Sequence, residues 1–388
     1  MNLLFVNYHD FRSNSAVHIA NLADHLERLG TSCAIAVPLR ARQTVGILGE
    51  HRFQALDFKK AGRGRFRFPD RQPPNILHAW TPREGVRRLT SELADRYSIP
   101  YFVHLEDNED VIAADQLGFA RDQLMSISDA EIEGRLTSTI SHPRRYREFL
   151  AGAAGVTMIV DRLGELVPPG VPTHVLWPAF EEGLFKPQAP SPSLRRELGL
   201  QPSDRVVVYA GNVHPTNAAE VRDLYLAVIE LGRRGLPVRL VRLGQDFVDF
   251  LGRDAEALRQ VEVRVPFQPR ERLPSLYALA DVLVQPGQPG VFNDFRIPSK
   301  LPEFFAMGLP VILPRSNVGL IAQDGEECLL LDQGDAVDIA AKVERVLRDD
   351  ALRERLGRGA RSFAERTFSW ERSARALHAF YETALAHA

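Results

Sequence analysis

Short apolar runs alternate with amphipathic helical stretches along this chain, and this alternation constrains the fold more than any other feature. Residues 2–8 form an apolar run of strand length, residues 16–29 carry apolar side chains on one helical face, and residues 33–37 are apolar again. A strand, a helix and a second strand in this order form a parallel pair joined by a right-handed crossover. The start of the chain therefore predicts an open α/β sheet.

The alternation occurs in two sets, separated by a proline-rich segment at 177–192. Further strands of the first set are expected at 76–80, 101–105, 156–160 and 174–177, with a helical stretch between 130 and 151. In the second set, strands are expected at 205–210, 238–243, 282–285 and 310–313, and helices at 218–234, 274–280, 336–348 and 351–368. We predict an α/β protein of two facing, doubly wound, Rossmann-like domains. Their expected limits are 1–178 for the first domain, 179–192 for a linker, 193–368 for the second domain and 369–388 for a last helix.

The composition is that of an ordinary globular protein. With 388 residues, of which 45% are hydrophobic, the chain is long enough for two cores. A net charge of -2 gives no overall attraction to nucleic acid. Cys33 and Cys328 lie far apart in apolar runs, which argues against a disulfide framework or a zinc site. Because no targeting segment and no membrane-spanning apolar run is seen, we expect a cytoplasmic protein.

Residues 293–311 carry the most chemical information. They predict an extended loop, a short helix that starts at Ser299 and ends at Gly308, and then a buried strand. Ser299 can cap the helix beside Lys300, so the helix start suits an anion. Glu303 lies four residues after Ser299 rather than three, so a capping box does not explain it.

The chain resembles the GT-B glycosyltransferases of the family-4 type, or glycosyl transferases group 1. The resemblance depends on the order of several pieces: the first strand and helix, Trp-Pro-Ala-Phe at 177–180, the segment 293–311 and Phe-Ser-Trp at 368–370. It implies that the last helix returns to the first domain. It also implies transfer of a sugar from a UDP- or GDP-linked donor to a glycan, lipid-linked or small-molecule acceptor, with retained configuration and without a metal or cofactor.

The resemblance also assigns a donor site. It implies that Glu303 accepts hydrogen bonds from the nucleotide ribose, while Lys300 and Arg296 stabilise the diphosphate. Related proteins often carry another Glu eight residues earlier, and this chain has Phe295 there, with Asp294 beside it.

Two loops after strands differ from the family pattern. Where relatives have paired glycines after the first strand, this chain has Ser13 and Asn14, which could still hold an anion. After the strand 205–210, Gly211 is followed by Asn212 in place of the usual Arg. We therefore expect Arg242, Arg296 or Lys300 to supply the missing positive charge.

An acidic loop follows the strand 101–105 and is the candidate acceptor site. His104, Glu106 and Asp107 are candidates to orient an acceptor hydroxyl or take its proton, since a general base needs an imidazole or a carboxylate. The alternative is a solvated loop. His78, near the end of another strand, is more typical of a core residue than of a catalyst.

One basic stretch favours a partner of opposite charge. Basic residues interleave with Phe66 and Phe68 between 59 and 71; they are Lys59, Lys60, Arg63, Arg65, Arg67 and Arg71. Such a stretch suits anionic lipid headgroups, as on the inner face of a membrane, or nucleic acid; the alternative is a flexible solvated loop.

Two further functions stay open. One is a nucleotide-sugar epimerase on the same double fold, which would need no acceptor. The other is a degenerate transferase that binds a sugar nucleotide without chemistry, suggested by the missing glycine pair and Arg/Lys pair.

Overall fold

The computed structural model describes residues 1–386, so residues 387 and 388 of the predicted last segment lie outside it. The chain divides into two compact units. The first contains Met1–Pro178 together with the residues from Trp370 onward, and the second contains Ala179–Ser369. By this division, the segment 179–192 that we expected as a linker belongs to the second unit.

The first unit contains a seven-stranded parallel sheet in the order β3-β2-β1-β4-β5-β6-β7. Its strands are β1 Asn2–Asn7, β2 Ser32–Val37, β3 Gln54–Asp57, β4 Ile76–Trp80, β5 Tyr101–Leu105, β6 Gly155–Met158 and β7 Thr173–Val175. Leu4 of β1 pairs with Ala34 on one side and Leu77 on the other. The strand order therefore reverses between β1 and β4.

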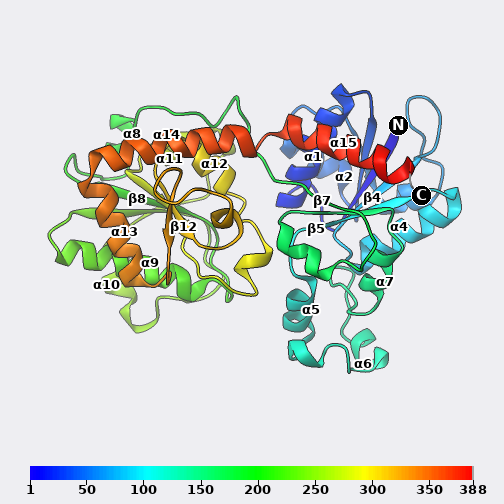
Figure 1. Cartoon of the computed structure of the whole chain (residues 1–388), viewed down its shortest axis with the longest axis horizontal. Helices are drawn as coiled ribbons and strands as arrows, with labels where there is room; N and C mark the ends of the chain where they lie inside the picture. Colours follow the sequence, from blue (N-terminus) through cyan, green and yellow to red (C-terminus); the bar gives the residue numbers. More distant parts are fainter. Residues whose placement is uncertain (387–388) are drawn as a thin grey trace. The chain divides into compact units, whose positions relative to one another are not determined.

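The helices of the first unit include one that comes from the end of the chain. They are α1 Asn14–Arg28, α2 Ala41–Thr44, α3 Phe58–Gly62, α4 Glu84–Tyr97, α5 Glu109–Leu117, α6 Asp129–Glu133, α7 Arg145–Ala151 and α15 Trp370–Ala386, with 3-10 turns at Val45–Leu48, Arg121–Gln123 and Asp161–Leu166. Helix α15 (red) lies beside α1 (blue) in Figure 1. The predicted return of the last helix to the first domain is confirmed.

The second unit has the same α/β architecture, with a sheet of six parallel strands in the order β10-β9-β8-β11-β12-β13. The strands are β8 Arg205–Ala210, β9 Val238–Leu243, β10 Glu262–Val265, β11 Val282–Val284, β12 Val311–Pro314 and β13 Leu329–Leu331. The helices are α8 Pro192–Glu197, α9 Ala218–Arg233, α10 Ala255–Arg259, α11 Leu273–Tyr277, α12 Leu301–Ala306, α13 Ala336–Arg348 and α14 Asp350–Thr367, with 3-10 turns at Gly252–Asp254, Arg270–Arg272, Asn293–Phe295 and Asn317–Leu320. The predicted fold class, two Rossmann-like α/β domains, is confirmed.

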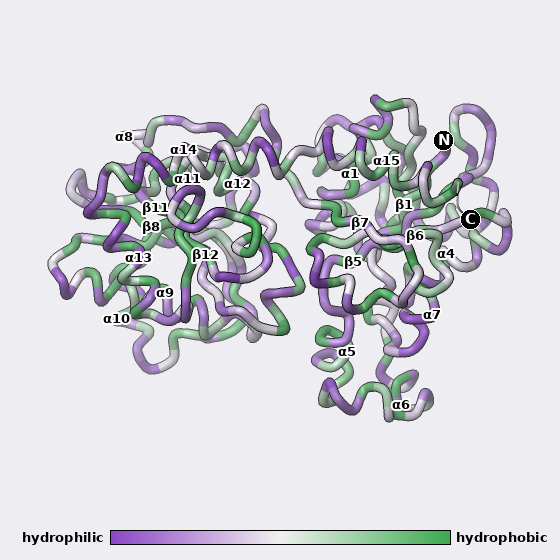
Figure 2. Tube along the Cα trace, viewed as in Figure 1, coloured by the Kyte–Doolittle hydropathy of each residue, from purple (hydrophilic) through white to green (hydrophobic). Residues whose placement is uncertain are grey.

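Hydrophobic burial explains why these segments form these elements. One face of α9 carries apolar residues at helical spacing, and all of them are buried in the core of the second unit. They are Val221, Leu224, Tyr225 and Val228. The inner strands β1 and β8 are mostly apolar, as expected for parallel strands covered on both faces. Figure 2 shows these strands as hydrophobic traces inside each unit, with hydrophilic residues on the outer helices.

Two local predictions were wrong. Lys300, not Ser299, is the N-cap of α12, and no side chain caps this helix, because the Leu301 amide bonds the Pro298 carbonyl in a preceding turn. The stretch 130–151 is not one helix. Gly134, which weakens a helix, and Pro143, which breaks one, lie between α6 and α7.

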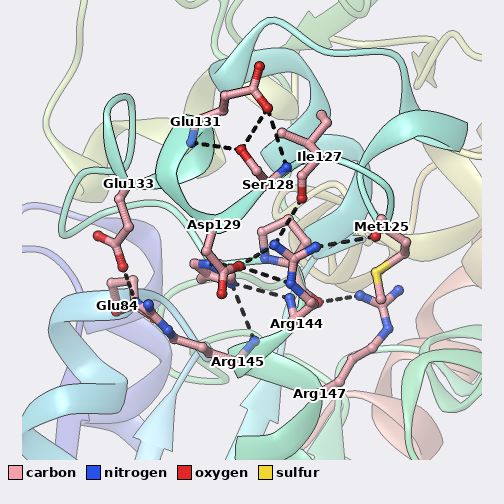
Figure 3. Close-up of polar contacts among 12 residues, drawn as sticks. Glu84, Met125, Ile127, Ser128, Asp129, Glu131, Glu133, Arg144, Arg145 and Arg147 are labelled. Carbon is pink, nitrogen blue, oxygen red and sulfur yellow. Dashed lines mark hydrogen bonds and ion pairs between the residues drawn. The ribbon is translucent and has the colours of Figure 1, made fainter.

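Residues 109–144 form an excursion after β5, with a small core of its own that includes Leu117, Leu124 and Ile132. Figure 3 shows how the start of α7 holds it. Arg144 bonds the Ile127 carbonyl at 2.9 Å and Asp129, while Arg145 pairs with Glu133. The excursion is therefore anchored beside the strand end that carries the acidic loop.

Candidate functional site

Each unit has one place where the strand order reverses, between β1 and β4 in the first and between β8 and β11 in the second. Doubly wound sheets bind ligands beyond the carboxyl ends of the strands at this point. The residues predicted for donor and acceptor binding mostly follow these strands. We therefore describe two candidate sites, one in each unit.

Glu106 is the central acidic group of the first unit. It follows β5 and accepts hydrogen bonds from the Ser15 hydroxyl at 2.5 Å and from Trp80 Nε1 at 2.8 Å. The His18 ring lies 3.7 Å from the same carboxylate. Burial favours the neutral acid, but these hydrogen bonds and the adjacent histidines outweigh it and lower the pKa of Glu106 to about 2. Glu106 is therefore a stable carboxylate rather than a strong base.

His104 lies inside the sheet, not on the surface of the site. Its ring is 1% exposed and stacks on Trp80 at 3.9 Å, and its Nδ1 lies 2.7 Å from the Thr157 hydroxyl. Burial lowers the pKa of His104 to about 3, so it is neutral at pH 7. This placement corrects the expectation that His104 faces a substrate.

His78 is also a core residue. It is fully buried, and it lies 2.6 Å from the Tyr381 hydroxyl of α15 and 3.1 Å from the Thr157 hydroxyl. Thr157 thus joins the two histidines, and the last helix of the chain is bonded to the interior of the first sheet.

Asp107 is more accessible than Glu106 and lies 3.6 Å from Arg83. Arg83 is buried, stacks over the Tyr8 ring at 3.9 Å and lies 3.8 Å from the buried Glu109. Arg83 thus lies between the carboxylates of Asp107 and Glu109, and Asp107 is more exposed than Glu106 or Glu109.

Ser13 and Asn14 lie where the polar loop after β1 meets α1. Ser13 is the N-cap of this helix, and its hydroxyl accepts from the Ala16 amide at 3.2 Å. Asn14 is exposed in the first turn. The structure thus gives Ser13 a capping role. Both residues lie at the start of α1, which follows β1, one of the two strands between which the strand order of the first sheet reverses.

Glu303 is the central acidic group of the second unit. It lies in the first turn of α12 and is 3% exposed. Arg270 donates to one carboxylate oxygen at 2.8 Å, and the Tyr277 hydroxyl donates to the other at 3.2 Å. Lys300 lies 3.7 Å from the second oxygen. The predicted neighbours Glu303 and Lys300 are thus together.

The residues before α12 begin with a 3-10 turn and continue in extended backbone at Arg296. Asp294 belongs to the 3-10 turn Asn293–Phe295, and the Arg296 guanidinium stacks over the Phe292 ring at 4.0 Å. Arg296 and Ser299 are both partly exposed.

Arg242 does not supply a charge at the surface of the loop after β8. It is fully buried, donates to the Gly211 carbonyl at 2.6 Å and pairs with Asp246 at 2.8 Å. The Asn212 side chain accepts from the Gln245 amide at 2.9 Å. Arg242 therefore holds the loops after β8 and β9 together, contrary to the expected role in binding a diphosphate.

Sequence reasoning missed several residues of these groups. Arg83 follows β4, a strand with correctly predicted limits, so its position after a strand was an available signal. Arg270 and Tyr277 gave no local signal, because they meet Glu303 only through the fold. The same holds for Glu220 of α9, which accepts from Asn293 at 2.6 Å and whose pKa burial raises.

Three other findings concern residues 1–386. No group of three or more His, Cys, Asp or Glu residues there is arranged to hold a metal ion. Within the same range, every helix is too short or too polar to cross a bilayer. Cys33 and Cys328 are both buried free thiols.

Comparison with known proteins finds a family that the second unit resembles. Residues 204–349, which include β8 to β13 and the group around Glu303, match the family model of glycosyl transferases group 1. The match is confined to the second unit. A D-inositol 3-phosphate glycosyltransferase of Nocardioides sp. is 30% identical over 234 residues, covering 55% of this chain and 49% of the relative. The chain thus spans about half the length of the curated relatives it matches.

Solved structures extend the comparison to the fold of the whole chain. HepE of Anabaena in complex with UDP matches with a TM-score of 0.73 at 13% identity, over 99% of this chain and 100% of that one. Sucrose-phosphate synthase of Thermosynechococcus elongatus matches with a TM-score of 0.68 at 16% identity, over 100% of both chains. The predicted GT-B fold is confirmed.

Proposed function

We propose that this protein is a glycosyltransferase that transfers a sugar from a nucleotide-diphosphate donor to a hydroxyl acceptor. The observation that carries the proposal is the group around Glu303, which lies inside the segment matched by the family. In this proposal, Glu303 accepts hydrogen bonds from the ribose, and the donor is UDP- or GDP-linked. The complexes of HepE with UDP and UDP-glucose support a nucleotide-sugar donor.

The leaving diphosphate carries the charge that must be stabilised during transfer. Lys300 and Arg296 are the cations proposed for this task, and the amides near Ser299 and Asp294 are proposed to assist. Gly211 and Asn212 would line the same donor site. We propose that the reaction retains the anomeric configuration, as the resemblance implies, and uses no metal or cofactor.

The first unit is proposed to hold the acceptor, which is a glycan, a lipid-linked sugar or a small molecule. A carboxylate with a pKa of about 2 has little tendency to take a proton at pH 7, so Glu106 would orient the acceptor rather than act as its base. Asp107 would meet the acceptor hydroxyl directly. Ser13 and Asn14, predicted to contact a donor phosphate, are proposed to hold an anion at the start of α1.

Contact with an anionic membrane from the cytoplasmic side is a further part of this proposal. All six basic residues predicted between 59 and 71 are exposed. Phe66 and Phe68, by contrast, are buried and pack on each other at 5.0 Å, so they are not available for insertion. Such contact would depend on charge alone and would weaken with salt.

One observation favours a second function, that of a binding protein without catalysis. The loop after β8 carries no exposed arginine, and Arg242 is internal. Such a protein would bind the nucleotide sugar through the Glu303 group but would leave it intact.

A thermal-shift screen across UDP- and GDP-sugars tests the proposal, because a ligand bound only by the folded state raises its stability. We expect one donor to raise the melting temperature, and product analysis with that donor then to show transfer once an acceptor is added. An epimer formed from donor alone would identify an epimerase instead. Binding with neither hydrolysis nor transfer would identify the non-catalytic protein.

A further inference from the structure

Arg270 lies between two carboxylates of the second unit. Its Nε donates to Glu181 at 2.5 Å, and its Nη1 donates to Glu303 at 2.8 Å. The guanidinium also stacks over the Phe185 ring at 5.1 Å. The flat guanidinium group is thus fixed by two directed bonds and one ring face, and a lysine could not reproduce this arrangement.

The second oxygen of Glu303 is held independently. Tyr277 donates to it at 3.2 Å, and the Tyr277 ring packs edge-on against Phe304 at 5.1 Å. Burial and the adjacent Glu303 carboxylate raise the pKa of Tyr277, so its hydroxyl keeps the proton that it donates. A carboxylate offers about four acceptor positions. Arg270 and Tyr277 occupy two of them, which leaves two for hydroxyl groups of a ligand.

The charges along this row alternate in sign: Glu181, Arg270, Glu303 and Lys300. Burial disfavours the charged form of Arg270, but the two carboxylates outweigh it and raise its pKa. The carboxylate of Glu303 is almost fully buried and needs a cation such as Arg270 beside it, because an unpaired buried charge is strongly unfavourable.

We propose that Arg270, anchored by Glu181, is a positioning residue that aims the Glu303 carboxylate at the two ribose hydroxyls of the nucleotide. This inference rests on the proposed function, in which Glu303 binds the ribose. Arg270 itself does not touch the nucleotide in this arrangement. Its effect is to fix the two remaining acceptor positions of Glu303 in one orientation.

Discrimination between ribose and dideoxyribose tests this role, because a purely structural ion pair would not alter it. Isothermal calorimetry would compare UDP with 2′,3′-dideoxy-UDP, and GDP with its dideoxy form. We expect the wild-type protein to bind the ribose form of its nucleotide at least about tenfold more tightly, since hydrogen bonds to a charged acceptor are strong. Arg270→Gln should reduce this ratio to near one. Arg270→Lys should restore little of it.

Arg272→Gln is the matched control. Arg272 lies in the same 3-10 turn but pairs with the exposed Glu197. We expect its ratio to equal that of the wild type. Should Arg270→Gln fail to fold, Glu181→Gln and Tyr277→Phe replace it, each with an expected fall in the ratio of about threefold or more.

The outcomes separate the two claims. A wild-type protein that binds neither nucleotide overturns the proposed function and this inference together. A wild type that binds a nucleotide without preferring ribose overturns the role of Glu303, and with it the inference, but not donor binding. A full ribose preference in a folded Arg270→Gln variant overturns the inference alone.

Discussion

Glu106 and Glu303 are the central carboxylates of the two units, and they are held in different ways. The donors to Glu106 are the uncharged Ser15 and Trp80, with His18 nearby. Glu303 is held by the cations Arg270 and Lys300 and by Tyr277. Neutral donors stabilise a carboxylate without adding positive charge, whereas the cations around Glu303 make the second site suited to an anionic diphosphate. This contrast is the reason to propose that the second unit binds the donor and the first unit the acceptor.

The largest expected effect concerns donor affinity. We expect Glu303→Gln to weaken nucleotide binding by about tenfold to a hundredfold, because a hydrogen bond to a charged acceptor contributes about 1.5–3 kcal/mol. Glu106→Gln should leave this affinity unchanged. Calorimetry with the nucleotide found in the thermal-shift screen measures both. Equal losses in the two variants would show that the proposed division of labour is mistaken.

A smaller effect concerns the pH dependence of stability. The pKa of Glu106 is about 2 in the folded protein and near 4.5 when exposed, so its ionisation stabilises the fold above pH 5 and this contribution is lost as the pH falls towards 2. We expect the stability difference between the wild type and Glu106→Gln to shrink by about 2 kcal/mol from pH 7 to pH 3.

Urea unfolding followed by tryptophan fluorescence measures this difference in the first unit, because Trp80, Trp177 and Trp370 all belong to it. Glu92→Gln, on the exposed surface of α4, is the control and should show no such change. A difference that does not vary with pH would mean that the surroundings of Glu106 do not favour its charged form.

The smallest effect compares helix caps in the two units. Ser13→Ala should destabilise the first unit by about 1 kcal/mol, because the hydroxyl that accepts from the Ala16 amide is removed, and Ser13→Asp should preserve the cap. Ser191 caps α8 of the second unit in the same way, so Ser191→Ala is the matched control. Tryptophan fluorescence should detect only the Ser13 change. An effect of Ser13→Ala on donor affinity without a loss of stability would favour the anion-binding role instead.

Much of the fold could be predicted because burial leaves a local pattern. The limits of β4, β5, β8 and β9 were predicted correctly, since each is an apolar run of strand length. The strands that we missed, β3, β10 and β13, all lie at sheet edges. Edge strands are short, and β3 and β10 also carry polar residues, so their pattern is weak.

The candidate site residues were predicted from two kinds of signal. Glu106 was predicted because a polar residue after a buried strand lies at the ligand edge of a doubly wound sheet, whereas Glu303 and Lys300 were predicted from the start of a short helix and from the resemblance. His104 and Arg242 occupy similar positions in the sequence, yet both are buried. A polar residue near a strand end points either into the core or toward the ligand, and only the packed structure distinguishes these directions.

The sequence by itself determined the order of strands and helices, the presence of two α/β units and the family motif around Glu303, because each depends on residues that are close along the chain. Only the tertiary structure decided which groups hold the two carboxylates. Arg270 precedes Glu303 by 33 residues, and Trp80 precedes Glu106 by 26. Trp80 and Glu106 meet because β4 and β5 end at the same edge of a sheet, whereas Arg270 and Glu303 meet because a 3-10 turn packs beside α12. No local pattern records either meeting.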